Sequence, residues 1–160
     1  MKNYSFFILI LLVSINLSAQ NAEKEITQVL DNWHNAAAEA NFKTYFSLMT
    51  DDAIFIGTDP TENWNKKEFK SFSKPYFDRG KAWSFTSLER NIFIKNKIAW
   101  FDELLQTQMG LCRGSGVLEK TTNGWRIQHY VLSISIPNEN VAEITRLKKN
   151  FEEKFIKTIP

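Results

Sequence analysis

The residues best suited to acid–base chemistry are a carboxylate, a guanidinium and an imidazole on three consecutive predicted strands. Glu103, Arg113 and His129 each lie in a run rich in β-branched and aromatic residues. A carboxylate beside a guanidinium can form a two-point ion pair, which would fix the position and tautomer of a neighbouring imidazole. A histidine held in this way can act as general acid or base near neutral pH. These residues therefore predict a polar cluster facing the protein interior.

Alternation along each strand decides which side chains face inward. His129 shares a strand face with Trp125, whereas the charged Arg126 lies on the other face and prefers water, so we expect His129 to point inward. Both faces of the strand that carries Glu103 and Asp102 are partly apolar, so either face could point inward. A bulge would exchange the two faces.

Three interpretations of the cluster stay open. Glu103 and Arg113 could form a structural ion pair beside a hydrogen-bonded core histidine, the cluster could bind a ligand, or His129 could catalyse. Asp59 follows the first predicted strand, near the mouth of any cavity. It is either a second catalytic carboxylate or part of a turn with Pro60, in which its carboxylate accepts backbone N–H groups.

Large aromatic side chains could line a ligand pocket or simply fill the core. His34 is expected at the surface, because it lies beside the apolar stripe of its helix. Cys112 has apolar or glycine neighbours and is expected to be a buried, inert thiol. The candidate ligand-binding residues besides Arg113 are Trp33, Phe55, Trp64, Tyr76, Trp83, Trp100 and Met109.

The elements that must position these residues change character along the chain. Helical spacing and capping signals come first, and β-rich runs separated by short breakers such as Asn123-Gly124 follow. Helices followed by antiparallel strands predict one α+β domain, in which N-terminal helices close a curved antiparallel sheet into a cone with a blind interior. A last amphipathic helix is expected to pack on the domain or on a partner subunit. The predicted helices lie at 21–40, 42–49, 65–80 and from 140 onward, and the predicted strands at 53–56, 82–94, 97–106, 111–120 and 125–136.

Charge and composition exclude several classes of protein. The 20 basic and 18 acidic residues leave a net charge of only +2, which argues against a nucleic-acid or anionic-membrane binder. With one cysteine and two histidines, the chain cannot form an intrachain disulfide or a multi-cysteine zinc site. We therefore expect no metal and no cofactor.

The first nineteen residues have the form of a secretory signal peptide. Lys2 gives a positive start, residues 6–13 are an unbroken apolar run, and Ala19 is a small residue at the predicted cleavage point. The run is shorter than the ~20 residues that a membrane-spanning helix needs. We expect cleavage after Ala19 or Gln20 and an exported protein, periplasmic or secreted, without a lipid anchor or membrane attachment.

Several local strings resemble the SnoaL-like branch of the nuclear transport factor 2-like superfamily, which is related to ketosteroid isomerase and the polyketide cyclases. They are FIGTD at 55–59 with Trp64, AWFDE at 99–103, RGSGV at 113–117, and GWRI at 124–127 followed by His129 and Ser133. The resemblance covers residues 22–137 and implies the cystatin-like cone. It divides the chain into a signal peptide (1–19), a SnoaL-like domain (20–137) and an added C-terminal helix (138–160).

The resemblance implies less about chemistry, because this superfamily includes isomerases, cyclases, dehydratases, epoxide hydrolases and proteins without catalysis. It also implies a homodimer formed through the exposed face of the sheet. Many similar chains have a second histidine where Val131 stands here, which argues against two-histidine chemistry.

The expected function is the binding of a small, mostly apolar molecule in the cone. One alternative is an acid–base isomerase, cyclase or dehydratase that uses His129 with Glu103 or Asp59. The other is a dimeric interaction module whose cone is only a packed core.

Overall fold

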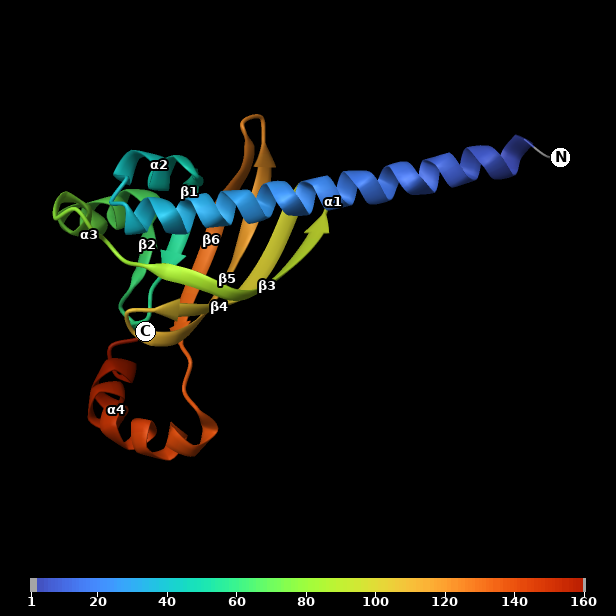
Figure 1. Cartoon of the computed structure of the whole chain (residues 1–160). Coiled ribbons are helices and arrows are strands. Elements are labelled where there is room, and N and C mark those ends of the chain that lie inside the picture. Colours follow the sequence, from blue (N-terminus) through green and yellow to red (C-terminus); the bar gives the residue numbers. More distant parts are fainter. Residues whose placement is uncertain (1–2, 160) are drawn as a thin grey trace.

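The computed structural model describes the backbone of residues 3–159 and the side chains of residues 20–159. Three N-terminal helices pack on a curved, open, six-stranded sheet, and a fourth helix follows (Figure 1). The predicted α+β fold is confirmed. The elements are α1 (Asn3–Ala38), α2 (Phe42–Ser47), β1 (Met49–Ile56), β2 (Asn63–Asn65), α3 (Lys66–Asp78), β3 (Phe85–Lys95), β4 (Ile98–Thr107), β5 (Gly110–Thr121), β6 (Gly124–Ile134), a 3-10 turn η1 (Asn138–Asn140) and α4 (Val141–Ile156).

The sheet has the strand order β2-β1-β6-β5-β4-β3. Strands β3 to β6 form a meander of antiparallel neighbours, and β1 pairs in parallel with β6, so the sheet is mixed. Asn96 and Gly124 adopt positive φ in two of the tight turns, the left-handed conformation that asparagine and glycine tolerate best. These short turns keep the register of the meander fixed.

The core forms where α1 crosses the sheet. Ile26, Leu30, Trp33 and Ala37 of α1 are fully buried and follow the three-and-four spacing of one helix face. The predicted capping box of α3 is present: the Asn65 side chain accepts from the backbone N–H of its partner three residues on, and that partner's carboxylate accepts from the Asn65 N–H. Helix α1 packs against β3 and β6, and α3 packs against β1 and β2.

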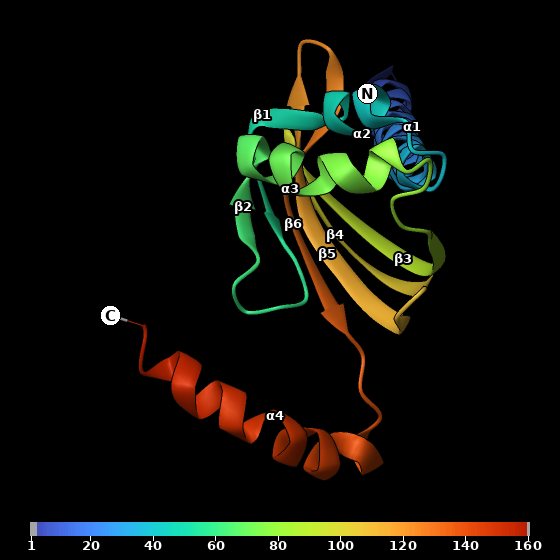
Figure 2. The same cartoon turned by 90° about the vertical axis from the view of Figure 1, so that its left-hand side faces the viewer.

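Helix α4 stands apart from the rest of the domain, and none of its residues is buried (Figure 2). The sequence left open whether this helix packs on its own domain or on another chain, and the structure shows no packing on its own domain. Leu147 and Ile156 are each 64% exposed. Its apolar side is therefore available for contact with another molecule.

The N-terminal part of α1, deep blue in Figure 1, extends beyond the sheet. Met1 and Lys2, which carry the positive start of the predicted signal peptide, lie outside the described residues. Among the side chains that the structure describes, the first buried one in the chain is Ile26. No helix in this described part is both long and apolar enough to cross a membrane.

Candidate functional site

A bulge in β6 reverses the orientation that alternation predicts for His129. Ile127 pairs with Leu118 and His129 pairs with Val117, so Gln128 is an extra residue in β6. Trp125 and Ile127 are buried before the bulge, whereas Tyr130 and Leu132 are buried after it. His129 consequently lies on the outer face of the sheet, and Tyr130 takes the inward position.

Arg113 also lies on the outer face, because the even-numbered residues of β5 face the core. Its side chain is 62% exposed, and its guanidinium lies 4.0 Å from the carboxylate of Asp102. Of the three residues in the predicted cluster, only Glu103 faces inward, where it is completely buried. The structure does not bring Glu103, Arg113 and His129 together.

Glu103 is instead bound by three side chains from three different elements. His34 of α1 lies with Nε2 2.8 Å from one carboxylate oxygen, and Tyr130 of β6 donates to the same oxygen over 3.2 Å. Arg90 of β3 donates from Nε to the other oxygen over 3.0 Å. Arg90 also reaches Asp31 of α1 at 2.8 Å. We call these five residues the buried polar network.

His34 was misplaced by the sequence prediction, since only 4% of it is exposed. The signal for its burial was present: His34 lies four residues after Leu30 and three before Ala37, both of which are in the buried stripe of α1. Asp31 lies three residues before His34 and so shares its side of the helix. Arg90 had no comparable signal, because a second bulge between Ser87 and Glu89 sets which face of β3 it occupies.

The network fixes the ionisation of its two central groups. Burial raises the pKa of Glu103, but the hydrogen bond and charge of His34 and the charge of Arg90 outweigh burial and hold that pKa below its ordinary value. Burial, followed by the adjacent charge of Glu103, raises the pKa of Tyr130 well above its ordinary value. At neutral pH, Glu103 is therefore an ionised acceptor and Tyr130 a protonated donor.

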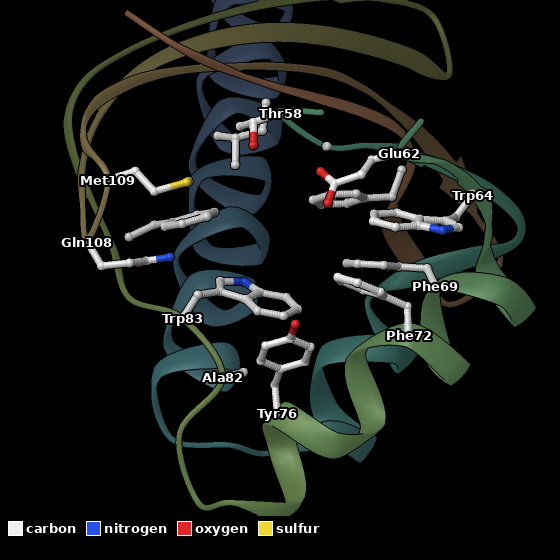
Figure 3. A pocket seen from close by; sticks show the side chains of 14 residues that line it. Thr58, Glu62, Trp64, Phe69, Phe72, Tyr76, Ala82, Trp83, Gln108 and Met109 are labelled. Atoms are coloured by element: carbon white, nitrogen blue, oxygen red, sulfur yellow. The ribbon is translucent and has the colours of Figure 1, made fainter. Parts of the chain in front are cut away.

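A pocket of about 250 Å³ lies between α3, the β1–β2 turn and the β4–β5 turn (Figure 3). Five of the predicted ligand-binding residues line it, namely Phe55, Trp64, Tyr76, Trp83 and Met109. The other lining residues are Gly57, Thr58, Glu62, Phe69, Phe72, Ala82, Phe85, Gln108 and Leu132.

The remaining predicted site residues lie elsewhere. Trp33 is fully buried in the core, and Trp100 is 45% exposed on the outer sheet face, where it stacks on Phe93. Asp59 accepts hydrogen bonds from the backbone N–H and the hydroxyl of Thr61, at 2.9 and 2.6 Å. These bonds, the hydroxyl bond first, lower the pKa of Asp59. Asp59 is a turn residue, and Glu62 is the carboxylate that lines the pocket.

A layer of aromatic rings separates the buried polar network from the pocket. Phe85 lines the pocket, and its ring meets the His34 imidazole edge-on at a centroid distance of 5.6 Å. Phe55 also lines the pocket and stacks on Tyr130 at 5.5 Å. The network supports the pocket wall through these rings, and none of its own residues lines the pocket.

No group of three or more His, Cys, Asp or Glu side chains is arranged to hold a metal ion within the part of the chain that the structure describes. Cys112 is buried, as predicted, and unpaired.

The sequence of residues 26–137, which is more than half of the chain, matches the family model of the SnoaL-like domain. The chain belongs to the SnoaL-like domain family. No curated protein sequence matches this SnoaL-like chain. Solved structures that resemble it share the fold at low sequence identity.

A nuclear transport factor 2-like protein of unknown function from Pseudomonas putida aligns with a TM-score of 0.65 and 14% identity, over 76% of this chain and 92% of that chain. One from Cytophaga hutchinsonii aligns with a TM-score of 0.61 and 14% identity, over 71% and 98%. A protein of unknown function with a cystatin-like fold from Nostoc punctiforme aligns with a TM-score of 0.57 and 11% identity, over 71% and 90%. These similarities support the cone-shaped fold of the SnoaL-like chain.

We expect Glu103→Gln to lower the free energy of unfolding by about 3–5 kcal/mol, because it removes one charge from a buried pair. Urea denaturation measures this loss. Asp102→Asn is the matched control, since Asp102 neighbours Glu103 in β4 but lies on the outer face, and a surface pair contributes about 1 kcal/mol or less. Equal effects of the two substitutions would contradict a structural role for the network.

The same two variants test the pH dependence of stability. A carboxyl whose pKa is lowered on folding contributes stability above its unfolded pKa, about 4.3 for glutamate, and loses it as the pH falls through the folded value. The native protein should therefore lose stability on acidification below about pH 4. The Glu103→Gln variant should show a smaller loss over that range than Asp102→Asn.

Proposed function

We propose that this SnoaL-like protein binds a small, mostly apolar molecule in the pocket beside α3. The observation that supports the proposal is the composition of the pocket wall. Seven aromatic side chains line the cavity, whereas its polar side chains are few, and such a wall is typical of small-molecule sites. A protein that used this region only as core would fill the space with side chains.

The volume of the pocket limits the size of the ligand. A volume of about 250 Å³ is below the ~300 Å³ at which pockets for drug-sized molecules begin. Two ring pairs stiffen the wall, with Phe55 and Phe69 stacked at 4.0 Å and Trp64 and Phe72 stacked at 4.3 Å. We infer a ligand of one or two rings, or an alkyl chain of similar bulk.

Catalysis by the predicted residues has weaker support than binding. His129 is on the outer face, and Glu103 is not among the residues that line the pocket. The lining residues Phe55 and Phe85 contact its partners Tyr130 and His34 instead. An acid–base reaction in this pocket would fall to Glu62 or Tyr76, the ionisable side chains among its lining residues. We therefore propose binding as the function and an acid–base isomerase, cyclase or dehydratase as the alternative.

Filling the pocket tests the proposal. When the purified wild-type protein is denatured, mass spectrometry should detect a released small molecule. The ligand-free protein should bind indole, and binding should change its tryptophan fluorescence. Ala82→Leu should weaken indole binding about tenfold or more, equivalent to at least ~1.4 kcal/mol, because Ala82 lines the cavity. Ala142→Leu on exposed α4 is the control. Equal indole affinity in both variants would contradict binding in this pocket.

We also propose that the protein forms a homodimer through the outer face of the sheet. Phe93 and Trp100 stack there while 48% and 45% exposed, and Leu111 on β5 is 48% exposed. Such side chains favour a two-fold interface in which the same patch serves both subunits.

Trp100→Glu should convert this dimer to a monomer in sedimentation velocity, because it places an unpaired charge in the interface. Leu147→Glu, on the exposed side of α4, should leave the dimer intact. Dissociation by Leu147→Glu instead would assign the interface to α4 and contradict the sheet interface. A native monomer would contradict dimer formation altogether.

We propose, finally, that the protein is exported with loss of its first nineteen or twenty residues. The extension of α1 beyond the sheet supports this, since Ala22 is the first described hydrophobic residue that packs against the core and Ile26 is the first that is fully buried. The mass of protein recovered from the periplasm or medium should place the new N-terminus at Gln20 or Asn21. Leu11→Lys should retain the full-length chain in the cytoplasm, because it interrupts the apolar run. An uncleaved exported protein would contradict the proposal.

A further inference from the structure

The charge of the pocket is unbalanced. Glu62 is the one charged side chain among the residues that line it, and no Lys, Arg or His is among them. The other polar side chains there are the neutral Thr58, Gln108, Tyr76 and the indole of Trp83. The side chains that line the pocket therefore carry a net negative charge, which opposes the entry of an anion.

The β1–β2 turn holds Glu62 in place. The backbone N–H of Gly57 donates to the Glu62 carbonyl at 2.9 Å, and the Glu62 N–H donates to the Asp59 carbonyl at 2.9 Å. The Asp59 N–H donates to Oε2 of the Glu62 side chain at 3.1 Å. The carboxylate is thus anchored through one oxygen to the backbone of its own turn.

Gly57 leaves room for this arrangement. A Cβ atom at position 57 would lie 2.1 Å from Oε2 of Glu62, so the carboxylate could not keep this position, and 3.0 Å from the Glu62 Cβ, which is a tight contact. With glycine at this position, the Glu62 side chain folds across the turn, and Figure 3 shows its carboxylate pointing into the pocket, between Thr58 and Trp64. The turn therefore fixes the direction of this carboxylate.

The other carboxylate oxygen, Oε1, has no hydrogen-bond donor among the described residues, and no described Lys, Arg or His lies within salt-bridge distance of Glu62. Glu62 is half-buried against an aromatic wall. Withdrawing a carboxylate from water is unfavourable unless a partner of opposite charge or a hydrogen-bond donor replaces the water. With no donor among the described residues, Oε1 is open to water or to a ligand that enters the pocket.

The aromatic wall favours the same kind of partner. Ring faces carry negative charge density and attract cations, more strongly where water is excluded than at exposed sites. Trp64, Phe72, Tyr76 and Trp83 line the pocket with Glu62 (Figure 3). One ring of this wall already has such a partner, since the guanidinium of Arg79 lies 4.7 Å from the centroid of the Tyr76 ring.

We propose that the ligand of this pocket is a small organic ammonium ion, whose charged nitrogen binds Oε1 of Glu62 while its apolar part lies against the rings. This inference rests on the proposed ligand-binding function and names the chemical class of the ligand. The ammonium group replaces the water lost by the carboxylate, and the aromatic wall binds the hydrocarbon part.

Calorimetric titration of the full chain with three probes of one skeleton tests the assignment: phenethylammonium, phenethyl alcohol and phenylacetate. The native protein should bind phenethylammonium about tenfold or more tightly than the alcohol, a difference of at least ~1.4 kcal/mol. Phenylacetate should bind most weakly. The Glu62→Gln variant should bind phenethylammonium and the alcohol with similar affinity, because glutamine keeps an oxygen for the Asp59 N–H and loses the charge.

Glu89→Gln, at an exposed position of β3 outside the pocket, is the matched control and should keep the native preference. Equal binding of the amine and the alcohol by the native protein would overturn the ammonium assignment and leave the proposed binding function standing. A preference that persists in Glu62→Gln would overturn the role of Glu62. Failure of all three probes to bind would count against both the assignment and the proposed function.

Discussion

The buried carboxylate of Glu103 sets the constraint on which the rest of the domain depends. A completely buried charge is tolerable only where partners replace its hydration, and here the partners come from α1, β3 and β6. Satisfying Glu103 therefore requires the first helix and three strands to meet in one arrangement. Arg90 extends the network to Asp31, a half-exposed residue on α1, so the helix is tied to the sheet twice.

The shape of the pocket depends on this arrangement indirectly, through two phenylalanine side chains. Phe85 contacts the imidazole of His34 and Phe55 contacts the ring of Tyr130, and both phenylalanines line the pocket. The sequence made Glu103 a candidate for both a structural and a ligand-binding role, and the structure divides these roles between two carboxylates. The inner carboxylate, Glu103, holds the fold together, while the carboxylate of the turn, Glu62, is the one that a ligand could contact.

The order of elements could be predicted from local signals, since each depends on residues close in sequence. Local sequence patterns predicted the capping box at Asn65, the turn at Gly124 and the buried stripe of α1, and the structure contains all three. The orientation of Glu103 could not be decided, because both faces of its strand are partly apolar. His129 was placed on the wrong face because one inserted residue, Gln128, reverses every side chain after it.

The sequence by itself determined the fold family, the aromatic composition of the interior and the candidate export signal, because periodicity, turn chemistry and apolar runs are local properties of the chain. Only the tertiary structure decided which polar groups meet. His34 and Glu103 are 69 residues apart, and Arg90 joins them only because two bulges and the sheet curvature fix which faces point inward. Such pairings are set by the global register of the strands, which no short window of sequence contains.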